Sequence, residues 1–96
     1  SAPLHYANGM ALIRSGNKPA AVGSFKHAMQ LEGNNVQYAY LYFLALDSIG
    51  STAQAISELK SKISTYNNAV KLKSLGMSFT KKLKNAEGYQ FFKQLK

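Results

Sequence analysis

The sequence predicts an all-α fold of six helices arranged as antiparallel pairs, and three observations support this prediction. When the 96-residue chain is shifted along itself until Gly16 meets Gly50, apolar and glycine positions coincide. Apolar residues recur at the three- and four-residue spacing of amphipathic helices. Glycine or asparagine separates the apolar stretches, where helices end and begin. The shift equals the length of a helix–turn–helix repeat, about 34 residues, so we expect a solenoid of such pairs.

The self-alignment matches small and apolar residues in both helices of each unit. The matched positions are Ala11-Leu12 with Ala45-Leu46, Gly16 with Gly50, Ala21-Val22 with Ala55-Ile56, Phe25 with Leu59, Met29 with Ile63, and Asn34 with Asn68. Because glycine adopts a positive φ at little cost, we expect Gly16 and Gly50 to end the first helix of their units.

Residues that favour helix N-termini follow the predicted turns. Asn17 precedes Lys18-Pro19, Ser51 and Gln54 have the spacing of a capping box, and Asn34 and Gln37 resemble one. The predicted helices cover residues 4–15, 18–31, 35–49, 52–65, 69–83 and 86–95. They make one domain, residues 1–96, with units at about 4–34, 35–67 and 68–96, which we interpret as a fragment of a longer protein.

The segment from Val36 to Leu46 carries two secondary-structure signals. Its tyrosines alternate as in a β-strand, where tyrosine is favoured. The run is long for a strand, however, and it follows an asparagine, ends near Gly50 and keeps register with the helix of the first unit. We therefore predict a helix, and because it is apolar nearly all round we place it in the middle of the stack.

The units resemble tetratricopeptide repeats. That family has a small and an apolar residue on the first helix, glycine at the turn, and alanine, aromatic and alanine on the second helix. The first unit has all of these, at Gly9, Leu12, Gly16, Ala21, Phe25 and Ala28. The second unit keeps Leu46, Gly50 and Ala55, but it has Phe43 at the small position, Leu59 at the aromatic position and Lys62 at the last alanine position. The third unit has Lys84 at the turn glycine and Tyr89 at the packing alanine. The resemblance implies a right-handed superhelix with an atypical last unit, as terminal repeats often are.

Positive charge is concentrated in the last third of the chain. Twelve lysine and arginine residues stand against four acidic ones, which gives a net charge of +8. Residues 1–59 are balanced, whereas residues 60–96 contain nine lysines and a single acid, Glu87. This asymmetry indicates either an anionic partner for that end or a solvated lysine face that keeps the domain soluble.

No group of residues predicts an enzyme, a metal centre or a cofactor site. The chain has no cysteine, so disulfides and thiolate ligands are excluded. His5 and His27 have no carboxylate or second histidine at helical spacing, and the four acids are scattered. The glycines form no phosphate-binding loop, and no serine lies in a nucleophile elbow. The longest apolar stretch is shorter than the roughly 20 residues that span a bilayer. We expect a non-catalytic, soluble binding protein, either cytoplasmic or from a bacterial periplasm.

In tetratricopeptide domains the first helix of each unit lines a concave groove. The resemblance implies groove positions at Tyr6, Met10, Ile13 and Arg14 in the first unit, Gln37, Tyr40, Leu44, Asp47 and Ser48 in the second, and Lys71, Ser74, Ser78, Lys81 and Lys82 in the third. Such a groove is apolar and aromatic at one end and basic at the other, and it suits a protein or peptide partner with acidic groups. The alternative is that its apolar residues pack against further repeats.

The lysine-rich third allows a second hypothesis, binding to an anionic polymer or to a membrane surface. Nucleic acid is not the expected partner, because Arg14 is the only arginine and the aromatic residues occupy core-like positions. On the fifth helix we predict a buried stripe of Leu72, Leu75, Gly76, Phe79 and Leu83, opposite Lys73, Lys81 and Lys84. Phe91 and Phe92, near the end of the chain, are candidates for a contact between two copies of the chain.

Overall fold

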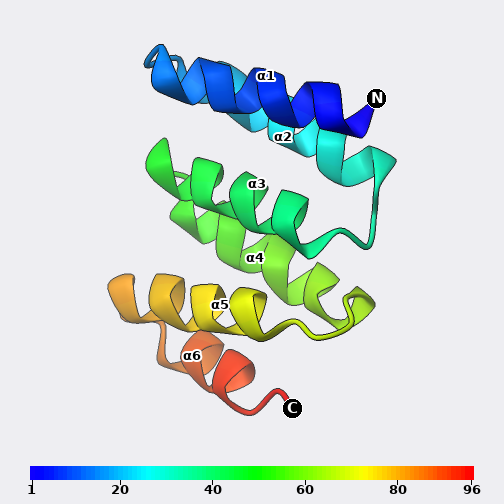
Figure 1. Cartoon of the computed structure of the whole chain (residues 1–96). Helices are drawn as coiled ribbons and strands as arrows, with labels where there is room; N and C mark the ends of the chain where they lie inside the picture. The colour runs from blue at the N-terminus through cyan, green and yellow to red at the C-terminus, as the bar shows by residue number, and fades with distance from the viewer.

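Six α-helices form three antiparallel pairs that stack one on another (Figure 1). The computed structural model describes all residues from 1 to 96. The helices are α1 (Ala2–Arg14), α2 (Lys18–Leu31), α3 (Val36–Ser48), α4 (Thr52–Lys62), α5 (Val70–Lys82) and α6 (Ala86–Lys93), with a 3-10 turn, η1 (Ile63–Thr65), directly after α4. The prediction of an all-α fold with six helices in repeated pairs is confirmed.

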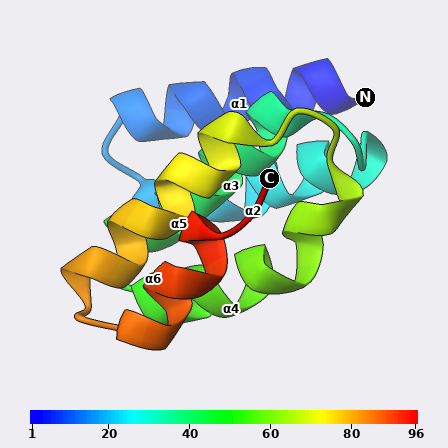
Figure 2. The same ribbon diagram turned by 90° about the horizontal axis from the view of Figure 1, so that it is seen from below.

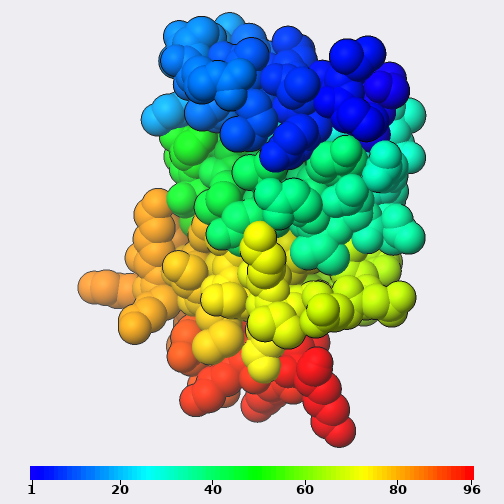
Figure 3. Space-filling view, in the orientation of Figure 1, coloured from blue at the N-terminus to red at the C-terminus, as the bar shows by residue number.

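The first helices of the three pairs lie along one side of the stack, and the second helices lie along the other. Two views at right angles show α1, α3 and α5 in one layer and α2, α4 and α6 in the other (Figures 1 and 2). The space-filling view shows the pairs in chain order from one end of the molecule to the other (Figure 3). The tyrosine-rich helix α3 contacts α2, α4 and α5, so it is the central helix that its apolar surface predicts.

The turns inside the three pairs share one backbone conformation. Gly16 and Gly50 both have φ +84°, as predicted from their place after the apolar stripe. Lys84 occupies the corresponding position of the third unit and is also left-handed, with φ +55°. A lysine in this region is strained, because its Cβ crowds the neighbouring carbonyl oxygen. The third turn therefore keeps the geometry of the repeat without its glycine.

Two predicted helix caps differ in the structure. Asn17 caps α2 as expected, and its side chain accepts a hydrogen bond from the N–H of Ala20 at 3.4 Å. Helix α3 is capped by Asn35, not Asn34, because the Asn35 side chain is the one that reaches the N–H of Tyr38, at 3.1 Å. Ser51 is the N-cap residue of α4 but makes no side-chain cap bond.

Glycine allows the helices of the outer pairs to approach closely. A Cβ atom on Gly9 would lie 2.6 Å from the Phe25 ring, and a Cβ on Gly76 would lie 2.6 Å from the Phe92 ring. In the middle pair, Phe43 takes the place of the glycine, and the backbones of α3 and α4 stay farther apart than those of α1 and α2.

The third pair repeats the packing of the first pair slightly out of register. Two exact repeats would place the counterparts of Gly9 and Phe25 at positions 77 and 93, whereas the glycine and the ring that pack together are Gly76 and Phe92. The buried residue near the start of α6 is accordingly Gly88, and Tyr89 is only half-buried. The residue of α6 that packs closely against Thr80 of α5 is therefore Gly88, and not Tyr89 as predicted from the exact repeat.

A single cluster of 17 buried apolar residues runs through the stack, from Ala21 to Phe92. The predicted stripe on α5 contributes Leu72, Leu75 and Phe79 to it. Leu83 is not part of the stripe, since α5 ends at Lys82 and the Leu83 side chain is 44% exposed.

Candidate interaction surface

The residues predicted to line a groove all lie on α1, α3 and α5, and we call this side of the stack the first-helix face. Five of them are half-buried: Tyr6, Met10, Tyr40, Leu44 and Asp47. The other nine are exposed: Ile13, Arg14, Gln37, Ser48, Lys71, Ser74, Ser78, Lys81 and Lys82.

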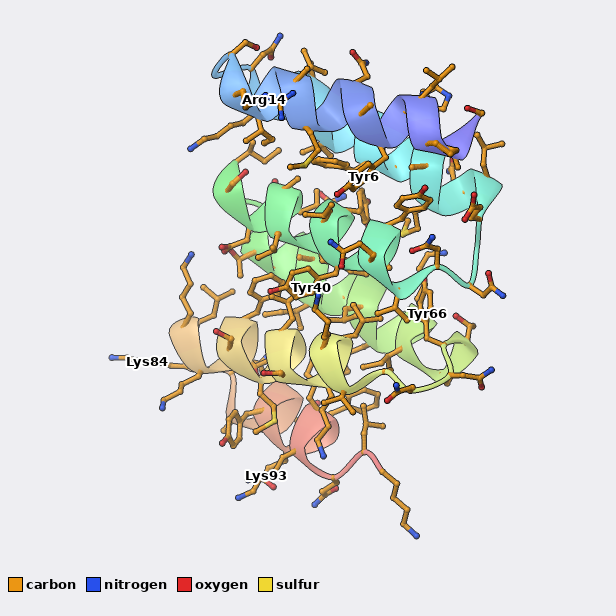
Figure 4. The ribbon with its side chains drawn as sticks, in the orientation of Figure 1. Tyr6, Arg14, Tyr40, Tyr66, Lys84 and Lys93 are labelled. Atoms are coloured by element: carbon orange, nitrogen blue, oxygen red, sulfur yellow. The ribbon has the colours of Figure 1, made fainter.

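At the α1 end of the face, the aromatic residues join the first unit to the second. Tyr6 lies between the first and second pairs (Figure 4). Its ring centre is 5.4 Å from that of Tyr38 on α3 and 6.3 Å from that of Phe25 on α2. Desolvation between the helices, with Glu32 and Tyr6 nearby, raises the pKa of Tyr38. Tyr6 therefore holds neighbouring helices together and offers only part of its ring to a partner.

In the middle of the face, a lysine from α5 rests on a tyrosine from α3. The Lys71 Nζ lies 4.5 Å from the centre of the Tyr40 ring and donates a hydrogen bond to the Gln37 side-chain oxygen at 3.1 Å (Figure 4). The ring attracts the ammonium through its quadrupole. Both neighbours of the ammonium are neutral, so the charge of the exposed Lys71 is not compensated within the chain.

Farther along the same two helices, an acid and a base neutralise each other. The Lys82 Nζ lies 2.8 Å from the Asp47 Oδ1, and the Thr52 hydroxyl donates to the same oxygen at 2.5 Å. The hydrogen bond from Lys82, followed by that from Thr52, lowers the pKa of Asp47 below its ordinary value. Of the predicted basic positions, Lys82 is therefore compensated within the chain.

Lys81 takes part neither in the contact of Lys71 with Tyr40 nor in the ion pair of Lys82 with Asp47. It lines a hollow of about 420 Å³ between the end of α5 and α6, together with Lys84 and Tyr89. The structure thus brings Gln37, Tyr40 and Lys71 together at one point, whereas it places Lys81 beside the last helix.

The two histidines of the chain, which are far apart in the sequence, lie side by side. The ring centres of His5 on α1 and His27 on α2 are 4.9 Å apart in an edge-to-face arrangement. Their separation along the sequence has no helical period, so only the antiparallel pairing of α1 with α2 reveals the contact. No third histidine or acid joins them in a group that fits a metal ion.

Lysines also lie over aromatic rings on the opposite side of the stack. The Lys60 Nζ on α4 is 5.0 Å from the Phe91 ring centre, and the Lys93 Nζ is 5.9 Å from that of Tyr89, both on α6. Tyr89 and Phe91 on α6 are thus aromatic residues that lie beside lysines and not only in the core. The sequence separation of Lys60 and Phe91 hid this contact.

No family model, curated protein or solved structure matches the chain. None of the six α-helices has both the length and the apolar character needed to cross a bilayer.

Proposed function

We propose that the chain is a non-catalytic interaction module of the tetratricopeptide type, which binds a segment of a partner protein across α1, α3 and α5. The sequence repeat, the stacked helix pairs and the left-handed residues at Gly16, Gly50 and Lys84 support this proposal. Three neighbouring helices on one side of a stack offer a continuous surface that suits an extended or helical segment.

The observation that carries the proposal is the position of Lys71 over Tyr40. An ammonium held by a ring and an amide has its orientation fixed before a partner arrives, which reduces the entropy lost on binding. Beside it, Tyr40 and Leu44 expose part of their apolar surface. This arrangement suits a partner segment with an acidic residue next to an apolar one, and the net charge of +8 attracts such a segment over a longer range.

A capture experiment tests the proposal. The chain is immobilised and incubated with native extract at moderate salt, beside the variants Lys71→Gln and Lys62→Gln. The control removes the same charge from an exposed position on α4. We expect a discrete protein to be retained by the original chain and by Lys62→Gln but lost with Lys71→Gln. Equal capture by both variants would show that the first-helix face is not the binding surface.

A second function, binding to an anionic polymer or membrane surface, is favoured by the contacts of Lys60 with Phe91 and of Lys93 with Tyr89. Cations and aromatic rings that occur together are typical of surfaces that hold phosphate-bearing polymers or lipid headgroups. This function predicts binding to anionic vesicles or single-stranded RNA that weakens steeply with added salt. It also predicts that Lys62→Gln weakens binding about as much as Lys71→Gln, whereas binding on the first-helix face is weakened by Lys71→Gln alone.

A further inference from the structure

A second hollow, which we call the terminal hollow, lies where the α4–α5 connection, the start of α5 and the end of α6 meet. Its volume is about 490 Å³, within the range of small-molecule sites. Figures 1 and 2 both show the end of the chain beside the start of α5. The lining residues that matter for binding are Ile63, Tyr66, Val70, Lys73, Met77 and Leu95.

The walls of the terminal hollow are largely apolar. Ile63 and Tyr66 are buried in the core, at 4% and 7% exposure, and present only one side to the space. Val70, the first residue of α5, lies at the rim. Its side chain is apolar, yet it is 68% exposed. Covering this surface with a hydrocarbon group removes apolar area from water, which is favourable.

Lys73 supplies hydrogen-bond donors to the terminal hollow. The Lys73 Nζ donates a hydrogen bond to the Leu95 backbone oxygen at 2.7 Å, so the half-buried ammonium is fixed beside the apolar walls. An ammonium has three N–H donors, and the remaining two are available to a ligand. The sequence had placed Lys73 on the solvent side of the helix, opposite the buried stripe, which the bond to Leu95 corrects.

The Tyr66 hydroxyl is a second donor. It has no hydrogen-bond partner in the chain, and because no fully buried side-chain polar atom lacks a partner, this hydroxyl is not fully buried. Tyr66 lines the terminal hollow, along with two lysines, Lys73 and Lys96, and no acidic residue. A ligand placed there therefore meets two lysine side chains and the Tyr66 hydroxyl, and no acidic side chain.

We propose that the terminal hollow binds a small apolar carboxylate, with its hydrocarbon tail between Ile63, Met77 and Leu95 and its carboxylate at Lys73 and Tyr66. Charge complementarity selects the anion, and the apolar walls select a hydrocarbon body over a compact anion such as inorganic phosphate. The site lies at the end of the stack, apart from the contact of Lys71 with Tyr40, and does not depend on the partner surface proposed above.

Titration with octanoate, below its micellar concentration, tests the proposal, and octanol serves as the neutral probe of equal tail length. Binding is followed by ¹⁵N chemical shifts, which also locate the site. We expect saturable shifts confined to residues around Ile63–Val70, Lys73–Met77 and Leu95. Octanoate should bind at least about tenfold more tightly than octanol, because a charged hydrogen bond strengthens the contact. Equal affinities, no saturable binding, or shifts centred on α1 and α3 would overturn the proposal.

Two variants separate the roles of charge and fold. Lys73→Met keeps the length of the side chain and should weaken octanoate about tenfold while changing octanol less than twofold. Tyr66→Phe removes only the hydroxyl and should weaken octanoate binding about threefold or more. If Lys73→Met does not fold, the affinity of Tyr66→Phe for octanoate tests the site instead. Lys62→Met, outside the terminal hollow, is the matched control. Unchanged octanoate affinity in a folded Lys73→Met or in Tyr66→Phe would contradict the assigned site.

Discussion

The Lys71 Nζ on α5 lies 4.5 Å from the centre of the Tyr40 ring on α3, so one contact both joins the second unit to the third and displays a positive charge. The two roles differ in energy. A cation–π contact at an exposed position contributes only about 0.5–1 kcal/mol to stability. Loss of the Lys71 charge, in contrast, removes the electrostatic attraction between this ammonium and an acidic group of the partner.

Lys71→Gln should therefore leave the chain folded. We expect its free energy of unfolding to fall by no more than about 1 kcal/mol, because the lost contact is exposed to solvent. Urea unfolding followed by circular dichroism measures this change. A much larger loss would mean that Lys71 is structural, and failed capture of a partner by this variant would then reflect unfolding.

Lys84→Gly should stabilise the chain. Lys84 has φ +55°, at the position where the other two units have glycine, and the left-handed region is costly for a side chain with a Cβ. We expect a gain of about 0.5–1 kcal/mol in the free energy of unfolding, the relief of strain being partly offset by the entropy of glycine. Leu83→Gly is the control: Leu83 has φ −89°, so glycine there should destabilise. A loss of stability in Lys84→Gly would contradict the turn geometry.

Gly9→Ala and Gly23→Ala should have opposite effects. A Cβ on Gly9 would lie 2.6 Å from the buried Phe25 ring, whereas a Cβ on Gly23 meets nothing within 4 Å. Overpacking at Gly9 should cost about 1–3 kcal/mol. Alanine at Gly23, an exposed position inside α2, should add about 0.5–1 kcal/mol through its helix propensity. Thermal unfolding of both variants checks the prediction, and similar shifts in the two Tm values would contradict the packing of α1 on α2.

Much of this fold is predictable from local signals. The glycine turns, the helix order and the helical state of the tyrosine-rich α3 all follow from periodicity and helix-end residues. The displaced register of the third pair does not, because it depends on where Gly76 and Phe92 meet across two helices. The same is true of the contact between His5 and His27 and of the inward direction of Lys73, which its bond to the end of the chain determines.

Asp47→Asn should reduce stability at neutral pH but not in acid. The hydrogen bonds from Lys82 and Thr52 lower the pKa of Asp47 below 3.8 in the folded chain, so the unfolded chain takes up the proton first as pH falls. The contribution of Asp47 is thus fully present above pH 3.8 and is lost as pH falls through the folded-state pKa. We expect a difference of at most about 1 kcal/mol at pH 7, because Lys82 is largely exposed.

A double-mutant cycle with Lys82→Gln, measured by urea unfolding at pH 7 and pH 3, isolates this pair. The coupling between the two substitutions should be favourable at pH 7 and smaller at pH 3. A coupling that is zero at pH 7, or that is larger at pH 3, would contradict the ion pair between α3 and α5.

Site-specific photo-crosslinking tests the central claim most directly, since it reports which side of the stack a partner touches. Position 40 on α3 and position 57 on α4 are each replaced in turn by p-benzoylphenylalanine, and the chain is irradiated in native extract. Ser57 is exposed on the second-helix side and is the matched control. We expect a discrete crosslinked protein from position 40 and none from position 57. Crosslinks from position 57 alone, or none from position 40, would contradict binding on the first-helix face.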